Sequence, residues 1–93
     1  MGIHIHTLEM KPRGFKDVPL SEIRAVRKIV SMIGEELKTR RKELGFTQES
    51  LAEELDISVA SVKRIEQGDR MPSLPMLIRF SRALKLNIAF QRK

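Results

Sequence analysis

The sequence predicts an all-α fold, a compact bundle of about five helices that contains a helix-turn-helix and is followed by one short strand. Over residues 20–44, apolar side chains recur at spacings of three, four or seven, which form one face of a helix. Residues 47–68 hold two shorter amphipathic stretches, joined by the corner Asp56-Ile57 and ended by a glycine. At residues 87–90 the spacing changes to alternation, which is typical of a strand. A single strand of this kind needs a partner.

The first helical stretch, residues 20–44, allows two arrangements. Its apolar face is formed by Ile23, Val26, Val30, Ile33, Leu37 and Leu44. Ser31 and Gly34 interrupt the middle of this face, so either one long helix continues to Leu44 or two nearly collinear segments meet near Ser31. The interruption favours two segments, with Ser31 capping the second. Gly45 ends the stretch, because glycine is common just beyond a helix.

Hydroxyl residues indicate where the later helices begin. Thr47, Ser58 and Ser73 each precede an apolar helical pattern, and side chains of this type accept hydrogen bonds from the first free N–H groups of a helix. Between the first two of these helices, Asp56 suits the corner, because aspartate tolerates a left-handed backbone better than most residues.

The chain divides into three parts. Residues 1–19 have no helical period and are expected to form an N-terminal arm. Within this arm His4 and His6 could be metal ligands, but the chain has no other histidine and no cysteine, which favours an exposed pair without function. No metal site and no cofactor are therefore expected. Residues 20–86 form the helix-turn-helix domain, and residues 87–93 form a dimerisation strand.

Composition narrows the class of partner. The net charge of +6, from 18 Lys and Arg against 12 Asp and Glu, favours anionic partners such as nucleic acid. Four Phe with no Trp or Tyr argue against a protein that stacks single-stranded bases.

Other functional classes find no support in the sequence. No apolar run approaches the roughly 18 residues that span a bilayer, and no signal-peptide pattern opens the chain. A cytoplasmic protein without a membrane partner is expected. No nucleophile–base arrangement, Gly-rich phosphate loop or metal cluster is evident, so we expect no enzyme.

The second short helix of the central stretch is the candidate element for reading double-stranded DNA. A helix in a major groove must expose short or hydrogen-bonding side chains while its other face is anchored. The candidate DNA-binding positions are Ser58, Val59, Ala60, Ser61, Lys63 and Arg64. Val59 and Ala60 suit thymine methyl groups, and Arg64 suits guanine. Lys63 suits a base edge or a phosphate, and Gln48, at the start of the preceding helix, suits a phosphate.

An ordered set of short motifs extends across residues 33–86. The motifs are Gly45-Phe46-Thr47-Gln48, Leu51-Ala52, Ile57-Ser58, Ile65-Glu66-Gln67-Gly68, and then Arg70, Pro72, Ser73 and Leu74. Together they resemble the Xre-type, lambda-repressor-like helix-turn-helix family. The resemblance implies that Gln48 binds a phosphate, that four positions of the second helix read bases (Val59, Ala60, Lys63 and Arg64), and that Arg41 and Glu66 form a structural ion pair. Asp56 departs from the pattern, since glycine is frequent there.

The segment over residues 84–90, LKLNIAF, follows the last helix directly. It resembles the C-terminal strand of the Hip-type antitoxins within this family. That resemblance implies a homodimer in which Ile88 and Phe90 pair with the same strand of a second copy. The alternative interface is the face of Ile23, Val26 and Val30.

Two related functions follow from these expectations. The favoured one is a repressor that binds a palindromic operator as a dimer and is the antitoxin of a toxin–antitoxin operon, with a cognate toxin as a second partner. The alternative is a stand-alone Xre-type regulator without a toxin. A bundle that binds only other proteins would share the helices and the caps, but it would not bind DNA.

Overall fold

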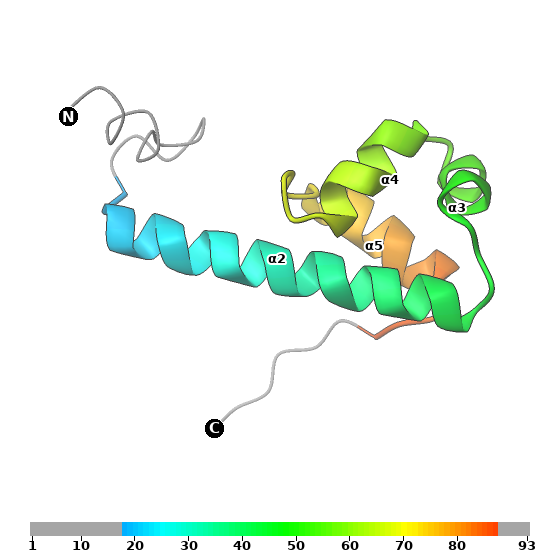
Figure 1. Cartoon of the computed structure of the whole chain (residues 1–93), viewed down its shortest axis with the longest axis horizontal. Coiled ribbons are helices and arrows are strands. Elements are labelled where there is room, and N and C mark those ends of the chain that lie inside the picture. The colour runs from blue at the N-terminus through cyan, green and yellow to red at the C-terminus, as the bar shows by residue number, and fades with distance from the viewer. Residues whose placement is uncertain (1–17, 88–93) are drawn as a thin grey trace.

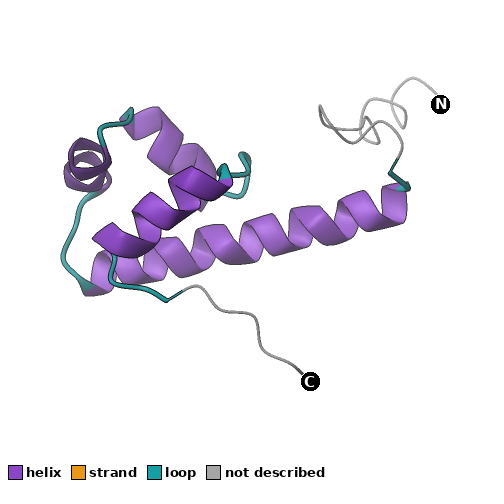
Figure 2. Cartoon of the chain, turned by 180° about the vertical axis from the view of Figure 1, so that it is seen from behind, coloured by secondary structure: helices purple, strands orange, loops and turns teal. Residues whose placement is uncertain are grey.

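The computed structural model describes residues 18–87, which form four helices. They are α2 (Leu20–Glu43), α3 (Gln48–Leu55), α4 (Val59–Glu66) and α5 (Leu74–Ala83). In Figure 1, α2 is a long rod, and the three shorter helices gather on its C-terminal half. Seen from behind, α5 lies nearer the viewer than α4 (Figure 2). The all-α fold is confirmed for the described residues.

The prediction of two segments over residues 20–44 is wrong, since α2 is one continuous helix of 24 residues. The described part of the chain therefore has four helices where about five were expected. A proline would have removed a backbone donor from the helix, whereas Ser31 and Gly34 both keep theirs. A glycine inside a helix costs only about 1 kcal/mol relative to alanine. Burial of Val30 and Leu37 on either side of the interruption offsets that cost.

The predicted starts of the three short helices are confirmed. The Thr47 hydroxyl accepts a hydrogen bond from the Ser50 backbone N–H, and the Ser50 hydroxyl accepts one from the Thr47 N–H, which completes a capping box. Ser58 and Ser73 cap α4 and α5 in the simpler way, each accepting from the N–H three residues later. These caps fix where the chain changes direction.

Among the residues with positive φ, Gly45 and Asp56 lie just beyond helices on either side of α3 and redirect the chain. Gly45, at φ +80°, follows α2 as expected. Asp56, at φ 54° and ψ 48°, forms the corner between α3 and α4 in the left-handed region. Aspartate therefore adopts here the backbone conformation that glycine adopts most easily.

The core lies where the short helices meet the C-terminal half of α2. Its buried members are Leu37, Leu51, Ala52, Leu55, Val62, Ile65, Phe80 and Leu84. Helix α3 packs against α4 and α5, while α4 also packs against α2. Because Val62 and Ile65 are buried, one face of α4 is held inward and the opposite face is left toward solvent.

Helices α2 and α4 approach so closely that only glycine fits between them. A Cβ atom placed on Gly34 would lie 2.3 Å from the backbone oxygen of Ile65 and 2.8 Å from that of Glu66. Gly34, which seemed to interrupt α2, is therefore the point at which α4 packs against α2.

Several expectations concern residues outside 18–87. The N-terminal arm with His4 and His6, and the strand residues Ile88 and Phe90, lie outside the described residues. Asn87, the last described residue, is exposed and belongs to no helix. No helix in the described range is both long and apolar enough to cross a membrane.

The alternative dimer interface at Ile23, Val26 and Val30 stays a prediction, but its side chains expose little surface. Ile23 and Val30 are buried, and Val26 is half-buried. The period of α2 correctly grouped these residues on one face, and most of that face is covered within the protein.

We predict that Gly34→Ala lowers the free energy of unfolding by about 1–3 kcal/mol, because a methyl group at this site overpacks the α2–α4 contact. Urea unfolding followed by circular dichroism measures the change. Thr39→Ala, at an exposed position of the same helix, is the matched control and is expected to be neutral or slightly stabilising. A Gly34→Ala variant as stable as the wild type would contradict the close packing described here.

Candidate nucleic-acid interface

The outward face of α4 carries the residues that were predicted to read DNA. Ser58, Ala60, Lys63 and Arg64 are exposed, and Ser61 is half-exposed. Figure 1 shows α4 and α3 side by side at the end of the molecule farthest from the start of α2. The structure thus brings two long cations and three short side chains together on one helical surface.

Val59 differs from its neighbours on this helix. Its side chain is half-buried and packs against the core, although the sequence pattern placed it among the outward residues. It is the first residue of α4 and directly follows the cap Ser58. Less of Val59 than of Ala60 is therefore available to a thymine methyl group.

Gln48 begins α3 and is joined to the end of α4. Its Nε2 atom donates a hydrogen bond to Oε1 of Glu66 across 3.1 Å. Because a carboxylate can only accept, the amide nitrogen is the atom that faces Glu66. This bond fixes the direction of the Gln48 side chain beside the free N–H groups of the first turn of α3.

Arg41 and Glu66 form a buried ion pair that joins α2 to α4. The Arg41 Nε donates to Glu66 Oε2 at 2.6 Å, and Nη2 donates to Oε1 at 3.2 Å. A third donor, Nη1, reaches the carbonyl oxygen of Phe46 at 2.8 Å. The two residues are only 6% and 4% exposed. Such a pair is stable in the interior because bidentate geometry and extra hydrogen bonds compensate for lost hydration.

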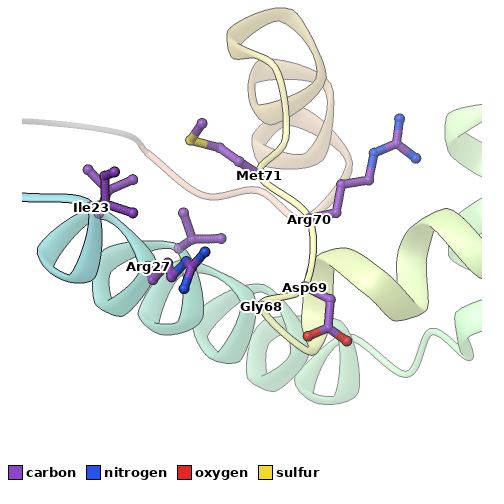
Figure 3. A pocket seen from close by; sticks show the side chains of 8 residues that line it. Ile23, Arg27, Gly68, Asp69, Arg70 and Met71 are labelled. Carbon is purple, nitrogen blue, oxygen red and sulfur yellow. The ribbon is translucent and has the colours of Figure 1, made fainter. Parts of the chain in front are cut away.

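Arg70 is a member of this surface that the sequence interpretation did not assign to it. Its Nη1 atom donates to the Ser61 hydroxyl across 3.0 Å, and that hydroxyl lies 2.9 Å from the Ser58 hydroxyl. Figure 3 shows the Arg70 side chain directed away from α2. A cation in a loop gives no periodic signal, so only the fold reveals that Arg70 returns to the first turn of α4.

The charges of the two short helices are unevenly distributed. Lys63, Arg64 and Arg70 are exposed on and beside α4, whereas Glu53 and Glu54 are exposed on α3. An anionic backbone is attracted to the first set and repelled by the second. Within residues 18–87, no group of three His, Cys, Asp or Glu side chains could hold a metal ion. The exposed chemistry of this surface is that of hydrogen-bond donors and positive charge.

Comparison with known proteins identifies the family. A family model described as helix-turn-helix matches residues 37–91, which is more than half of the chain. The chain belongs to the Xre-type helix-turn-helix family. Within this family, α3, the corner at Asp56 and α4 are the helix-turn-helix, and α4 is its second helix.

Curated relatives of this family member are named as regulators. The cryptic phage CTXphi transcriptional repressor RstR of Vibrio cholerae is 36% identical over 56 residues, covering 60% of this chain and 50% of the relative. The HTH-type transcriptional regulator DicA of Escherichia coli is 45% identical over 53 residues, covering 57% of this chain and 39% of DicA. An uncharacterized HTH-type transcriptional regulator of Methanothermobacter thermautotrophicus is 42% identical over 48 residues, covering 52% and 70% of the two chains. The matched segment thus spans half or less of RstR and DicA.

We predict that Arg41→Ala lowers the free energy of unfolding by about 3–5 kcal/mol, because it leaves the Glu66 carboxylate buried without its counter-ion. Urea unfolding measures the loss. The control is Glu43→Ala, which removes the exposed pair between Arg40 and Glu43 at 3.4 Å and should change the stability by less than about 1 kcal/mol. Equal effects of the two substitutions would show that the buried pair does not clamp the two helices.

Proposed function

We propose that this protein is a sequence-specific transcriptional repressor that binds double-stranded DNA in the cytoplasm through α4. The observation that carries the proposal is the division of α4 into two faces. Val62 and Ile65 anchor one face in the core, while Ala60, Lys63 and Arg64 are exposed on the other. A helix held in this way can enter a major groove while its other face stays packed in the core. The related repressor RstR and regulator DicA support the same role.

Within this proposal the residues have different tasks. Arg64 reads guanine through its fork of donors, Ala60 lies against a thymine methyl group, and Lys63 binds a base edge or a phosphate. Val59 and the hydroxyls of Ser58 and Ser61 complete the contact surface. These residues supply the sequence discrimination.

Gln48 is proposed to bind a phosphate and to set the register of the protein on the duplex. Its Nε2 group carries two hydrogens, and the bond to Glu66 uses one of them. The second can be donated to a phosphate oxygen that approaches the first turn of α3, where free N–H groups also favour an anion. Glu66 therefore orients Gln48 while it also holds Arg41.

One helix of eight residues reads only a few base pairs, so we propose that two copies act together on a palindromic operator. The two half-sites would lie about 34 Å apart, which is one turn of DNA. We assign the DNA-binding domain to residues 20–86, the arm to residues 1–19, and the dimerisation strand, with Ile88 and Phe90, to residues 87–93.

The antitoxin role is a narrower proposal. It rests on the resemblance of residues 84–90 to the Hip-type strand, and it adds a cognate toxin as a partner. A stand-alone regulator accounts for the same fold and the same relatives. Co-expression with the product of the adjacent gene separates the two: a stable complex that still binds the operator favours the antitoxin, and its absence favours the stand-alone regulator.

We predict that Arg64→Ala and Gln48→Ala weaken DNA binding in different ways. Loss of Arg64 should cost about 1–3 kcal/mol at one base-pair position and relax selectivity there. Loss of Gln48 should lower the affinity for all DNA sequences by a similar factor, because phosphates carry no sequence information. Gel shifts with the upstream DNA of the chain's own gene and single-base variants of it measure both effects.

Arg82→Ala is the matched control, because it removes one positive charge from an exposed position of α5. It should leave the sequence preference unchanged. Wild-type protein that binds no DNA would overturn the proposed function. Unchanged selectivity in Arg64→Ala would remove only this residue from the reading surface.

We predict that deletion of residues 87–93 halves the mass of the particle in solution, because it removes the proposed strand pairing. Sedimentation equilibrium measures the mass, and circular dichroism checks that the helices remain. An unchanged mass would place this dimer contact elsewhere in the chain.

A further inference from the structure

Five large apolar side chains are exposed on α2, on α5 and in the loop before α5. Within residues 18–87 these are Ile29, Met32, Met71, Leu74 and Ile78, and the term apolar face denotes them below. Met32 and Leu74 are 62% and 68% exposed, although each belongs to a helix. Ile29 and Met32 are one turn apart on α2, as Leu74 and Ile78 are on α5. Exposed apolar side chains that gather around one hollow, as Ile29, Met71 and Leu74 do, indicate an interaction site.

Three residues of the apolar face, Ile29, Met71 and Leu74, line a hollow between α2 and α5. Its volume is about 270 Å³, and its lining is entirely apolar, including Val26, Ile29 and Ile33 from α2 and Leu74 and Leu77 from α5. Met71 also lines a second hollow of about 460 Å³ beside the start of α2 (Figure 3). An apolar side chain inserted into the hollow would remove its lining from water. Burial of apolar surface is the main favourable term in association.

Charges on one flank of α2 indicate what covers this face. Lys28 and Glu35 are both exposed, and seven residues, two helical turns, separate them, so they lie on the same flank. Their Cα atoms are about 10 Å apart along the axis, which is too far for a pair within one helix. Within residues 18–87 neither side chain forms an ion pair.

We propose that the apolar face binds a second copy of this chain, with the two α2 helices antiparallel. A two-fold axis midway between residues 28 and 35 brings Lys28 of each copy to the partner's Glu35, so the ion pair forms twice. The same axis passes beside Met32 and brings Ile29 to within about 1.5 Å, along the helix, of the level of the partner's Ile33, at the edge of the hollow. An interface on a two-fold axis must be self-complementary in this way. One helix supplies both members of the charge pair, which fits a second copy better than an unrelated protein.

The proposed interface leaves the reading helix free. Gly34 faces α4, and Ile29 is five residues away, about 140° around the helix from it. Self-association through the apolar face therefore does not cover α4 and does not depend on DNA binding. With strand pairing at residues 87–93 as a separate contact, it would join two operator-binding dimers.

Charge exchange tests the proposal on the full chain without DNA. At low salt, Lys28→Glu and Glu35→Lys should each raise the dissociation constant of the α2 contact by about tenfold or more, because two ion pairs become two repulsions. The double variant should restore association to within about threefold of the wild type. Sedimentation equilibrium measures all four proteins, and thermal unfolding by circular dichroism confirms that these exposed substitutions keep the fold.

Two further variants complete the experiment. Met32→Glu places two carboxylates beside the axis and should halve the mass of the particle. Lys42→Glu, an exposed charge change at the far end of the same helix, should leave the mass unchanged. A wild-type chain that does not associate through this face, single variants that associate normally, or a double variant that fails to recover would each overturn the antiparallel pairing with a second copy.

Discussion

The close contact between α2 and α4 is the constraint on which the rest of the structure depends. Gly34 lets the two helices touch through backbone atoms, and seven residues later on the same face Arg41 binds Glu66. Glu66 also accepts from Gln48, and Arg41 also donates to the carbonyl of Phe46. A single buried carboxylate thus connects α2, the start of α3 and the end of α4. Any movement of α4 would break several of these contacts at once.

This rigidity determines how α4 can act. An anchored helix presents its exposed residues in one arrangement, so it binds DNA without first losing conformational freedom. The same network orients Gln48, which belongs to another helix, and Arg70 holds the hydroxyl of Ser61 from the loop beyond α4. The proposed reading and positioning contacts therefore come from three parts of the chain but form one surface.

The other side of α2 has a different character. There, apolar residues of α2 and α5 remain exposed around a hollow. In the proposed pairing, the flanking charges Lys28 and Glu35 meet the opposite charges of a second copy. On α2 the two surfaces are apart, since Gly34, which faces α4, and Ile29 of the apolar face lie about 140° apart around the helix. A single helix can in this way support DNA binding on one side and self-association on the other.

The sequence by itself determined the local features of this protein. Thr47, Ser58 and Ser73 begin helices, Gly45 and Asp56 turn the chain, and the ordered motifs predict the family, because caps, turns and periodicity act within a few residues. The tertiary structure decided what depends on residues distant in sequence. It made α2 continuous and placed Gly34 at the close contact between α2 and α4. It also turned Val59 partly inward and brought Arg70 to the hydroxyl of Ser61. These outcomes arise from packing between helices, and no local pattern of residues records which faces will meet.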